Sequence, residues 1–283
     1  MKEQSIKAKK FLNLHQSDGC FLMPNAWDAG SAKMFVASGF KAIGTTSAGI
    51  AFASGRPDNA FCSIDSRLSQ EEMINKTQPI VDSVSVPVNA DLEDGFGESP
   101  TKVSETISKA IHIGAVGGNI EDYTGHSEHP IYDELLAVER IKSARATIDQ
   151  SGIPFVLVAR TDLLNIGQSN QLNAAIDRAN LYREAGADCL FVPGVSDEKS
   201  IKELVRSIAG PINVVMGLSE SNLTLQQLAD LGVRRVSIGG SLARSMYFHI
   251  QKATIEMIRD GTFTFVEQQV PQSELNEIFE RKL

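Results

Sequence analysis

Apolar stretches with little polar alternation recur along the chain, separated by amphipathic segments. Each is rich in β-branched or small apolar residues, as expected of parallel strands buried on both faces. The eight stretches that we interpret as strands are Phe21–Met23, Ala42–Thr46, Val88–Asp91, Gly118–Glu121, Phe155–Arg160, Cys189–Val192, Ile212–Met216 and Arg235–Ile238. The amphipathic segments between them include Thr101–Ile113, Glu134–Gln150, Gln171–Ala185 and Ser200–Ala209. Eight such units predict a (β/α)8 TIM barrel of class α/β, and an open doubly wound sheet is the alternative.

The residues at the strand entries support this count. Four of the strands follow a glycine, at Gly39, Gly114, Gly186 and Gly232. Three others follow a proline, at Pro87, Pro154 and Pro211. Glycine ends helices in the left-handed conformation, and proline suits the first position of a strand. Their strict alternation indicates a repeated βαβα unit.

Nothing in the sequence resembles a linker between domains, because no stretch is Pro/Ser-rich or low in complexity. We therefore expect a single domain over residues 1–283, with a helical leader at Ser5–His15. A helical tail runs from Ser241 to Arg259, breaks at Gly261 and resumes at Ser273–Lys282. The tail either caps the barrel or forms an arm for a neighbouring subunit, and periodicity does not decide between the two.

Composition narrows the class of partner. The chain has 283 residues and a net charge of −8, which argues against nucleic acid or an anionic membrane as partner. No apolar run approaches the roughly 18 residues of a membrane span, and the amino terminus lacks the apolar core of a signal peptide. Cys20, Cys62 and Cys189 contain no CxxC pair, which suits a reducing compartment. We expect a cytoplasmic protein that acts on a small molecule.

Acidic residues gather where two of the predicted strands end. Asp91, Glu93 and Asp94 follow the strand that begins at Val88, and a Gly-aromatic-Gly turn comes next. Glu121 and Asp122 end the next strand. Like charges this close repel each other unless a cation lies among them. Oxygen-rich sites of this kind suit Mg²⁺, so we predict Asp91, Glu93 and Glu121 as metal-site residues. The alternative is a set of solvated acids or helix caps.

Other strand ends supply candidates for binding a substrate. The turn at Ser47, Ala48 and Gly49 is typical of an anion nest, in which backbone N–H groups face a carboxylate or phosphate. Arg160 is positioned to bind a substrate carboxylate through two hydrogen bonds. An internal ion pair of Arg160 with Asp162 or Glu121 is the alternative. Asn25 and Trp27 end the first strand, and Trp27 is either a pocket wall or part of the core.

These features together resemble the isocitrate lyase / phosphoenolpyruvate mutase superfamily over essentially the whole chain. The run from Asp91 to Gly97 resembles its metal motif, D-x-D-x-G-[FY]-G, with glutamate at the second acidic position. Glu121-Asp122 resembles its I-E-D strand, Pro57-Asp58 its L-P-D aspartate, and Arg160 its substrate-binding arginine. The resemblance implies Mg²⁺, a role for Asp58 at the site, and a barrel whose eighth helix is swapped onto a partner subunit. The implied assembly is a homotetramer, a dimer of helix-swapped dimers.

The loop from Tyr123 to Pro130 departs from the superfamily pattern. Lyases that cleave isocitrate or methylisocitrate carry a K-[KR]-C-G-H loop, whereas this loop has neither cysteine nor lysine. His126 and His129 are candidate acid/base groups on a mobile lid. The alternative is that both are exposed loop histidines without a catalytic role.

The chemistry that the resemblance implies is formation of a pyruvate-like enolate from a small α-keto or related carboxylic acid. Without the lyase cysteine, cleavage of a C–C bond in an oxaloacetate-like acid fits best. One alternative is P–C bond chemistry, as a phosphonomutase or a phosphonopyruvate hydrolase. That chemistry needs a cation near the lid, for which Lys33, Arg56 and Arg67 are candidates. The other alternative is a barrel that binds a keto acid without turning it over.

Overall fold

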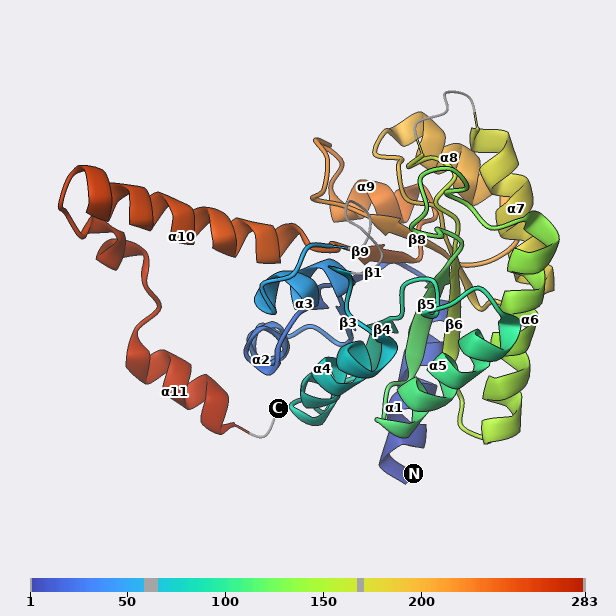
Figure 1. Ribbon diagram of the computed structural model, residues 1–283, viewed down its shortest axis with the longest axis horizontal. Coiled ribbons are helices and arrows are strands. Elements are labelled where there is room, and N and C mark those ends of the chain that lie inside the picture. Colours follow the sequence, from blue (N-terminus) through green and yellow to red (C-terminus); the bar gives the residue numbers. More distant parts are fainter. Residues whose placement is uncertain (1, 59–65, 167–170, 282–283) are drawn as a thin grey trace.

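All strands of the described chain belong to one parallel sheet that curls into a barrel (Figure 1). The structure is a computed structural model that describes residues 2–58, 66–166 and 171–281. The sheet order is β1-β9-β8-β7-β6-β5-β4-β3-β2. The strands are β1 (Phe21–Met23), β2 (Asn25–Ala26), β3 (Ile43–Thr45), β4 (Val88–Asp91), β5 (Gly117–Glu121), β6 (Val156–Arg160), β7 (Cys189–Phe191), β8 (Ile212–Val215) and β9 (Arg235–Ser237). The predicted (β/α)8 barrel is confirmed, with each predicted strand within two residues of its expected ends.

Pro24 separates two short strands: β1, which is the first predicted strand, and β2, which was not predicted. β1 pairs with β9, whereas β2 pairs with β3. Proline cannot donate a hydrogen bond to a ladder, but its carbonyl oxygen accepts from Gly44 N (2.8 Å). The chain therefore switches neighbours at Pro24, and this switch joins the two ends of the sheet into a nearly closed barrel.

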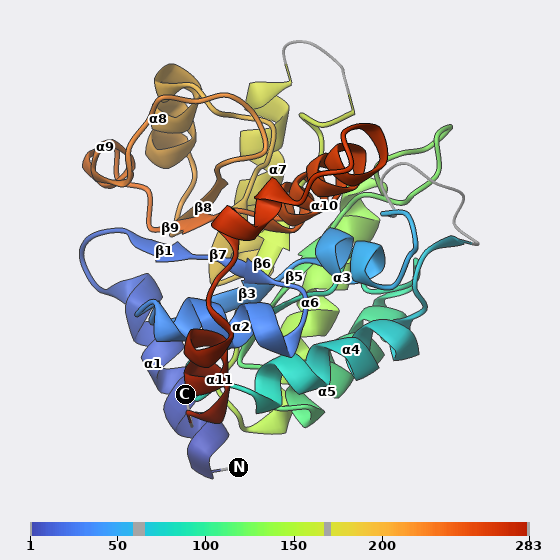
Figure 2. The same cartoon turned by 90° about the vertical axis from the view of Figure 1, so that its left-hand side faces the viewer.

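Helices alternate with the strands and cover the outside of the barrel (Figures 1 and 2). They are α1 (Lys2–Gln16), α2 (Ala29–Ala37), α3 (Ser47–Ala53), α4 (Gln70–Asp82), α5 (Pro100–His112), α6 (Glu134–Ser151), α7 (Leu172–Glu184), α8 (Glu198–Ser207) and α9 (Leu225–Asp230). The four amphipathic segments predicted from the sequence correspond to α5–α8, with ends displaced by at most two residues. The predicted leader is α1.

A small apolar cluster fills the amino-terminal half of the barrel interior. Phe11 of α1 is fully buried there, against Val116, Val156 and Cys189. Gly117 makes this contact possible, because a Cβ atom at that position would lie 2.5 Å from Cε1 of Phe11. The leader helix thus seals one end of the barrel, and the polar interior that remains opens toward the carboxyl ends of the strands.

The carboxyl-terminal region extends away from the barrel (Figures 1 and 2). It comprises α10 (Ser241–Arg259), a 3₁₀ turn at Thr264–Gln268 and α11 (Gln272–Glu280). Ala243 is the only buried residue of α10, and Phe248 and Ile258 are among its exposed apolar residues. The chain returns to α2, where Lys33 Nζ donates to the carbonyl of Phe279 (2.6 Å). Within the described residues, none of the helices is long and apolar enough to cross a membrane.

Candidate active site

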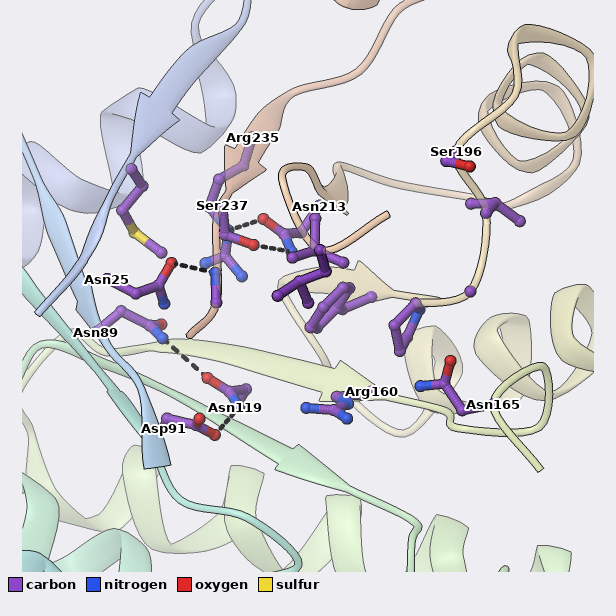
Figure 3. Close-up of a pocket in the computed structure, with 18 of the residues that line it drawn as sticks. Asn25, Asn89, Asp91, Asn119, Arg160, Asn165, Ser196, Asn213, Arg235 and Ser237 are labelled. Carbon is purple, nitrogen blue, oxygen red and sulfur yellow. Dashed lines mark hydrogen bonds between the residues drawn. The ribbon is translucent and has the colours of Figure 1, made fainter. Parts of the chain in front are cut away.

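A cavity of about 340 Å³ opens among the carboxyl ends of the strands (Figure 3). Such volumes lie at the lower end of those typical of small-molecule sites, so this cavity suits an acid of a few carbon atoms. Its polar lining residues are Asn25, Thr45, Asn89, Asp91, Asn119, Arg160, Asn165, Ser196, Asn213, Ser219, Arg235 and Ser237.

Asp91 is the acidic residue that lines this cavity. Its Oδ2 accepts hydrogen bonds from both the N–H and the hydroxyl of Ser47 (2.8 Å each), and its Oδ1 accepts from Asn119 Nδ2 (2.7 Å). Its backbone N–H donates to Thr45 Oγ1 (2.8 Å). A carboxylate offers about four acceptor positions, and three are occupied here. The side chain is therefore held in a fixed orientation with one position left for another ligand.

The predicted anion nest is the first turn of α3. Thr46 caps this helix, and its Oγ1 accepts from Gly49 N (3.3 Å). Ser47 N is engaged with Asp91. Gly49 is needed for packing as well, because a Cβ atom there would lie 2.9 Å from Cβ of Trp27. The segment thus binds an anion in this structure, but the anion is the side chain of Asp91.

Glu93, two residues after Asp91, has an unusual backbone conformation. It has a positive φ of 48°, a region that non-glycine residues rarely adopt and that costs energy. The side chain is buried, with no protein partner for Oε2 among the described residues. Burial raises the pKa of Glu93 to about 8; Arg67 opposes this shift, and the charges of Asp91, Asp94 and Asp58 add to it. Asp58 is half-buried and lies at the edge of the described chain.

Arg160 forms the internal ion pairs that the sequence left as an alternative. Its Nη1 lies 2.9 Å from Glu121 Oε2, and its Nη2 lies 2.7 Å from Asp162 Oδ1. The register places Glu121 directly opposite Arg160 on neighbouring strands. Burial raises the pKa of Glu121 and Arg160 opposes that rise; burial lowers the pKa of Arg160, and Asp162 and Glu121 more than reverse it. Arg160 nevertheless lines the cavity, and its Nε has no partner among the described residues.

Two acids of the sequence clusters are held in the scaffold instead. Asp122 accepts hydrogen bonds from Arg178 Nε and Tyr182 OH (2.7 Å each). Asp94 accepts from Arg67 Nη2 (3.1 Å) and Tyr132 OH (2.8 Å). Both are buried, so their charges are neutralised within the scaffold.

Asn25 lines the cavity, but its side chain also joins strands. Its Nδ2 donates to Thr45 O (2.7 Å), and its Oδ1 accepts from the backbone N–H groups of Ile238 and Gly239 (2.9 and 3.0 Å). Trp27 is absent from the lining of this cavity. It packs edge-on against Phe35, with ring centroids 6.4 Å apart, which corresponds to the core interpretation.

The two candidate loop histidines lie away from the cavity. Tyr123 and Ile131 form an antiparallel bridge that closes the loop, and Thr124 Oγ1 donates to the carbonyl of His129 (2.6 Å). His126 and His129 are both exposed, and neither lines the cavity. No residue of the loop from Tyr123 to Pro130 lines the cavity, so an acid/base role for either histidine requires the loop to move.

The acidic donors fit a hydrated Mg²⁺ better than a metal bound only by protein. Among the described residues, no three acidic, histidine or cysteine side chains come close enough to hold an ion directly. Mg²⁺ usually keeps several waters and takes one or two carboxylates. Asp91 has an open acceptor position, and the buried Glu93 Oε2 has no partner. Asp91 would therefore hold the ion, with Glu93 and Glu121 orienting its waters.

The polar residues inside the strands were not among the predicted site residues. Asn89, Asn119, Asn213, Arg235 and Ser237 are all buried and all line the cavity. A signal for them exists, because alternate residues of a strand share one face. Asn89 and Asp91 are two residues apart, as are Arg235 and Ser237. Polar residues two apart in an otherwise apolar strand thus mark the interior of this barrel.

Known proteins with this fold include both lyases and mutases. A solved putative lyase/mutase from Burkholderia cenocepacia is 42% identical, with a TM-score of 0.94, covering 99% of this chain and 98% of that one. The 2-methylisocitrate lyase of Salmonella typhimurium is 31% identical over 244 residues, 84% of this chain and 80% of that protein. A crystal structure of oxaloacetate acetylhydrolase is 26% identical, with a TM-score of 0.83 and coverage of 96% and 94%. The model of the phosphoenolpyruvate phosphomutase family matches residues 11–258. Because this model spans most of the chain and the lyase relative is more than 30% identical, the chain belongs to this family.

Proposed function

We propose that this protein is a Mg²⁺-dependent enzyme that cleaves a C–C bond in a small, oxaloacetate-like carboxylic acid through an enolate. The observation that carries the proposal is the meeting of Asp91 and Arg160 in one small cavity at the carboxyl ends of the strands. Active sites of (β/α)8 barrels lie at this end. Lyase and hydrolase relatives with this fold support the assignment to an enzyme.

Asp91 would hold the metal ion, because its carboxylate is fixed by Ser47 and Asn119 and keeps one open position. When bound there, Mg²⁺ stabilises the negative charge that develops on the keto oxygen as the bond to C3 breaks. Glu93 and Glu121 would orient the waters bound to the ion. Asp58 would add negative charge near Glu93, because its charge contributes to the raised pKa of Glu93. The substrate carboxylate would contact Arg160 and the first turn of α3 at Ser47, Ala48 and Gly49.

P–C bond chemistry is the alternative, and the positions of its candidate cations argue against it. Lys33 contacts α11, Arg56 pairs with Glu72 (3.0 Å), and Arg67 pairs with Asp94 (3.1 Å). None of the three lines the cavity. A barrel that binds a keto acid without turnover is the second alternative. The fixed geometry of Asp91 favours catalysis over that reading.

The exposure of α10 and the family resemblance support a proposal about the assembly. We propose a homotetramer in which α10 packs on a partner barrel, because α10 buries only Ala243 within its own chain. A cytoplasmic location is part of the same proposal, on the basis of the cysteine spacing.

A substrate panel tests this function directly. Oxaloacetate, phosphonopyruvate and 2-methylisocitrate are each incubated with the protein, with and without Mg²⁺. We expect Mg²⁺-dependent cleavage of oxaloacetate or of a closely related acid. Turnover of phosphonopyruvate alone would transfer the assignment to P–C chemistry. Binding of oxalate without turnover of any acid in a wider panel would favour the non-catalytic barrel.

A further inference from the structure

Arg235 is a buried cation that the proposed chemistry does not use. It begins β9, is only 2% exposed, and lines the same cavity as Asp91 and Arg160. Its Nε donates to Asn213 Oδ1 (2.8 Å), and Asn213 Nδ2 donates to Ser237 Oγ (2.9 Å) (Figure 3). This network holds the guanidinium plane at the wall of the cavity.

The guanidinium of Arg235 has no counter-charge among the described residues. Its Nη1 lies 3.5 Å from Nε2 of His15. His15 Nδ1 lies 2.9 Å from the carbonyl of Phe11, which leaves Nε2 as an acceptor. Burial and the charge of Arg235 lower the pKa of His15 to about 3, so this imidazole is neutral at pH 7. No described protein acceptor lies in hydrogen-bond range of Arg235 Nη2.

Buried charges in proteins are normally paired, because removing an ion from water costs several kcal/mol. Arg160 follows this rule, with Glu121 and Asp162 both in contact. Arg235 does not, although it is the more buried of the two. An uncompensated guanidinium that faces a cavity is therefore a site for an anion that comes from outside the protein.

We propose that Arg235, positioned by Asn213 and Ser237, is the residue that binds the second carboxylate of the oxaloacetate-like substrate. Because Asp91 and Arg160 line the same cavity, one carboxylate of a small acid contacts Arg160 while the other reaches Arg235. A single guanidinium neutralises one negative charge, and the neighbours of Arg235 are neutral. This balance suits a monoanionic carboxylate better than a dianionic phosphonate.

This inference rests on the proposed function for the first carboxylate, but the Arg235 site is testable by itself. Calorimetry would compare succinate with butyrate, which lacks the second carboxylate, and with 3-phosphonopropionate, which replaces it by a phosphonate. Each ligand is titrated with and without Mg²⁺. We expect the parent protein to bind succinate at least about tenfold more tightly than butyrate, from one charged hydrogen bond.

Arg235→Met removes the charge and keeps the length of the side chain. We expect it to weaken succinate binding about 10- to 150-fold and to leave butyrate binding within about twofold. Arg234→Met is the matched control, because the neighbouring Arg234 donates to the carbonyl of Gly19 outside the cavity. This control should keep the preference for succinate.

The melting temperature of Arg235→Met shows whether Arg235 serves to bind the ligand or to stabilise the fold. An unpaired buried charge carries a desolvation cost that an apolar side chain does not have, so the melting temperature of Arg235→Met should stay level or rise. If Arg235→Met does not fold, the same titrations are made with Arg235→Lys. A loss of affinity for succinate but not for butyrate would then support the proposed site. An equal loss of succinate and butyrate would assign Arg235 to the scaffold.

Three other results would overturn the proposal. Equal affinity of the parent for succinate and butyrate would remove the second carboxylate site, as would an unchanged preference in Arg235→Met. Tighter binding of 3-phosphonopropionate, lost in Arg235→Met, would assign the site to phosphonates. A succinate preference that needs Arg235 but ignores Mg²⁺ would support this site and contradict the metal part of the proposed function.

Discussion

The two sides of the cavity differ in how their charges are balanced (Figure 3). On the side of β4–β6, the acids Asp91, Glu93, Glu121 and Asp162 outnumber the base Arg160. On the side of β8 and β9, Arg235 stands among the neutral Asn213 and Ser237. Burial and the neighbouring acids raise the pKa of Glu93 on the first side, so this side suits a cation, whereas the second suits an anion. A ligand that combines a metal-chelating end with a distant carboxylate complements both.

Removing the acid at the centre of the negative side should have the largest effect. Asp91→Ala should lower kcat/KM by at least about 10³-fold, because metal-assisted charge stabilisation is worth several kcal/mol. Steady-state kinetics at saturating Mg²⁺ would measure the loss, with the exposed Asp177→Ala as control. The variant should still fold, with a modest fall in melting temperature, because Ser47 and Asn119 lose their shared acceptor. Turnover by Asp91→Ala in excess EDTA would contradict the metal assignment.

A smaller effect should follow from changing the shape of the cation on that side. Arg160→Lys keeps the charge but cannot contact Glu121, Asp162 and a substrate carboxylate at once, because lysine has a single ammonium group. Losing one charged hydrogen bond lowers kcat/KM about 10- to 150-fold. Oxalate affinity in the presence of Mg²⁺ should fall in parallel. Tight oxalate binding by Arg160→Lys would identify the arginine as a scaffold ion pair, and the exposed Arg206→Lys is the control.

Glu93→Gln tests whether the buried acid acts through metal-bound water. Substitutions that disturb groups next to metal ligands typically cost about 10- to 100-fold in metal affinity or activity, so the Mg²⁺ concentration for half-maximal activity should rise by that factor. The exposed Glu98→Gln serves as the control. An unchanged Mg²⁺ dependence would place Glu93 outside the metal site.

The pH dependence of stability tests the environment of Arg235, because His15 contacts its guanidinium. The pKa of His15 is lowered to about 3 in the folded chain. Protonation of His15 in the unfolded state therefore lowers the free energy of unfolding. This loss of stability is nearly absent above pH 6.5 and grows as pH falls toward 3. At pH 5 the unfolded state gains about 2 kcal/mol from protonating this histidine. His15→Gln should therefore lose about 2 kcal/mol less than the parent between pH 7 and pH 5 in urea unfolding. The exposed His112→Gln should follow the parent; a parallel fall in all three proteins would contradict the pKa of His15.

The fold could be predicted from the sequence because its signals are local. Apolar strands with glycine or proline at their entries marked β3–β9 closely. The second short strand, β2, was missed, because the change of neighbours at Pro24 has no local signal in the sequence. Periodicity did not decide whether α10 is an arm for a partner. It predicts that a segment is helical, but it does not identify the surface that packs against the helix.

The site could be predicted only in part, because its chemistry depends on register. Asp91 and Arg160 were identified as strand-end residues, and both line the cavity. The pairing of Arg160 with Glu121 was left as an alternative, because it requires these two residues to be neighbours across β5 and β6. Arg235 was missed because an arginine at the start of a strand normally indicates a surface position.

The exposed helix α10 gives the protein a property that dilution would reveal. Helices in proteins are stabilised mostly by tertiary packing, and α10 buries only Ala243 in its own chain. Its backbone amides should therefore exchange with solvent rapidly at nanomolar protein concentration. If other copies of the chain cover its apolar residues, exchange should slow as concentration rises, since association stabilises by mass action. The amides of β4–β6, which the barrel already encloses, should show no such dependence on concentration.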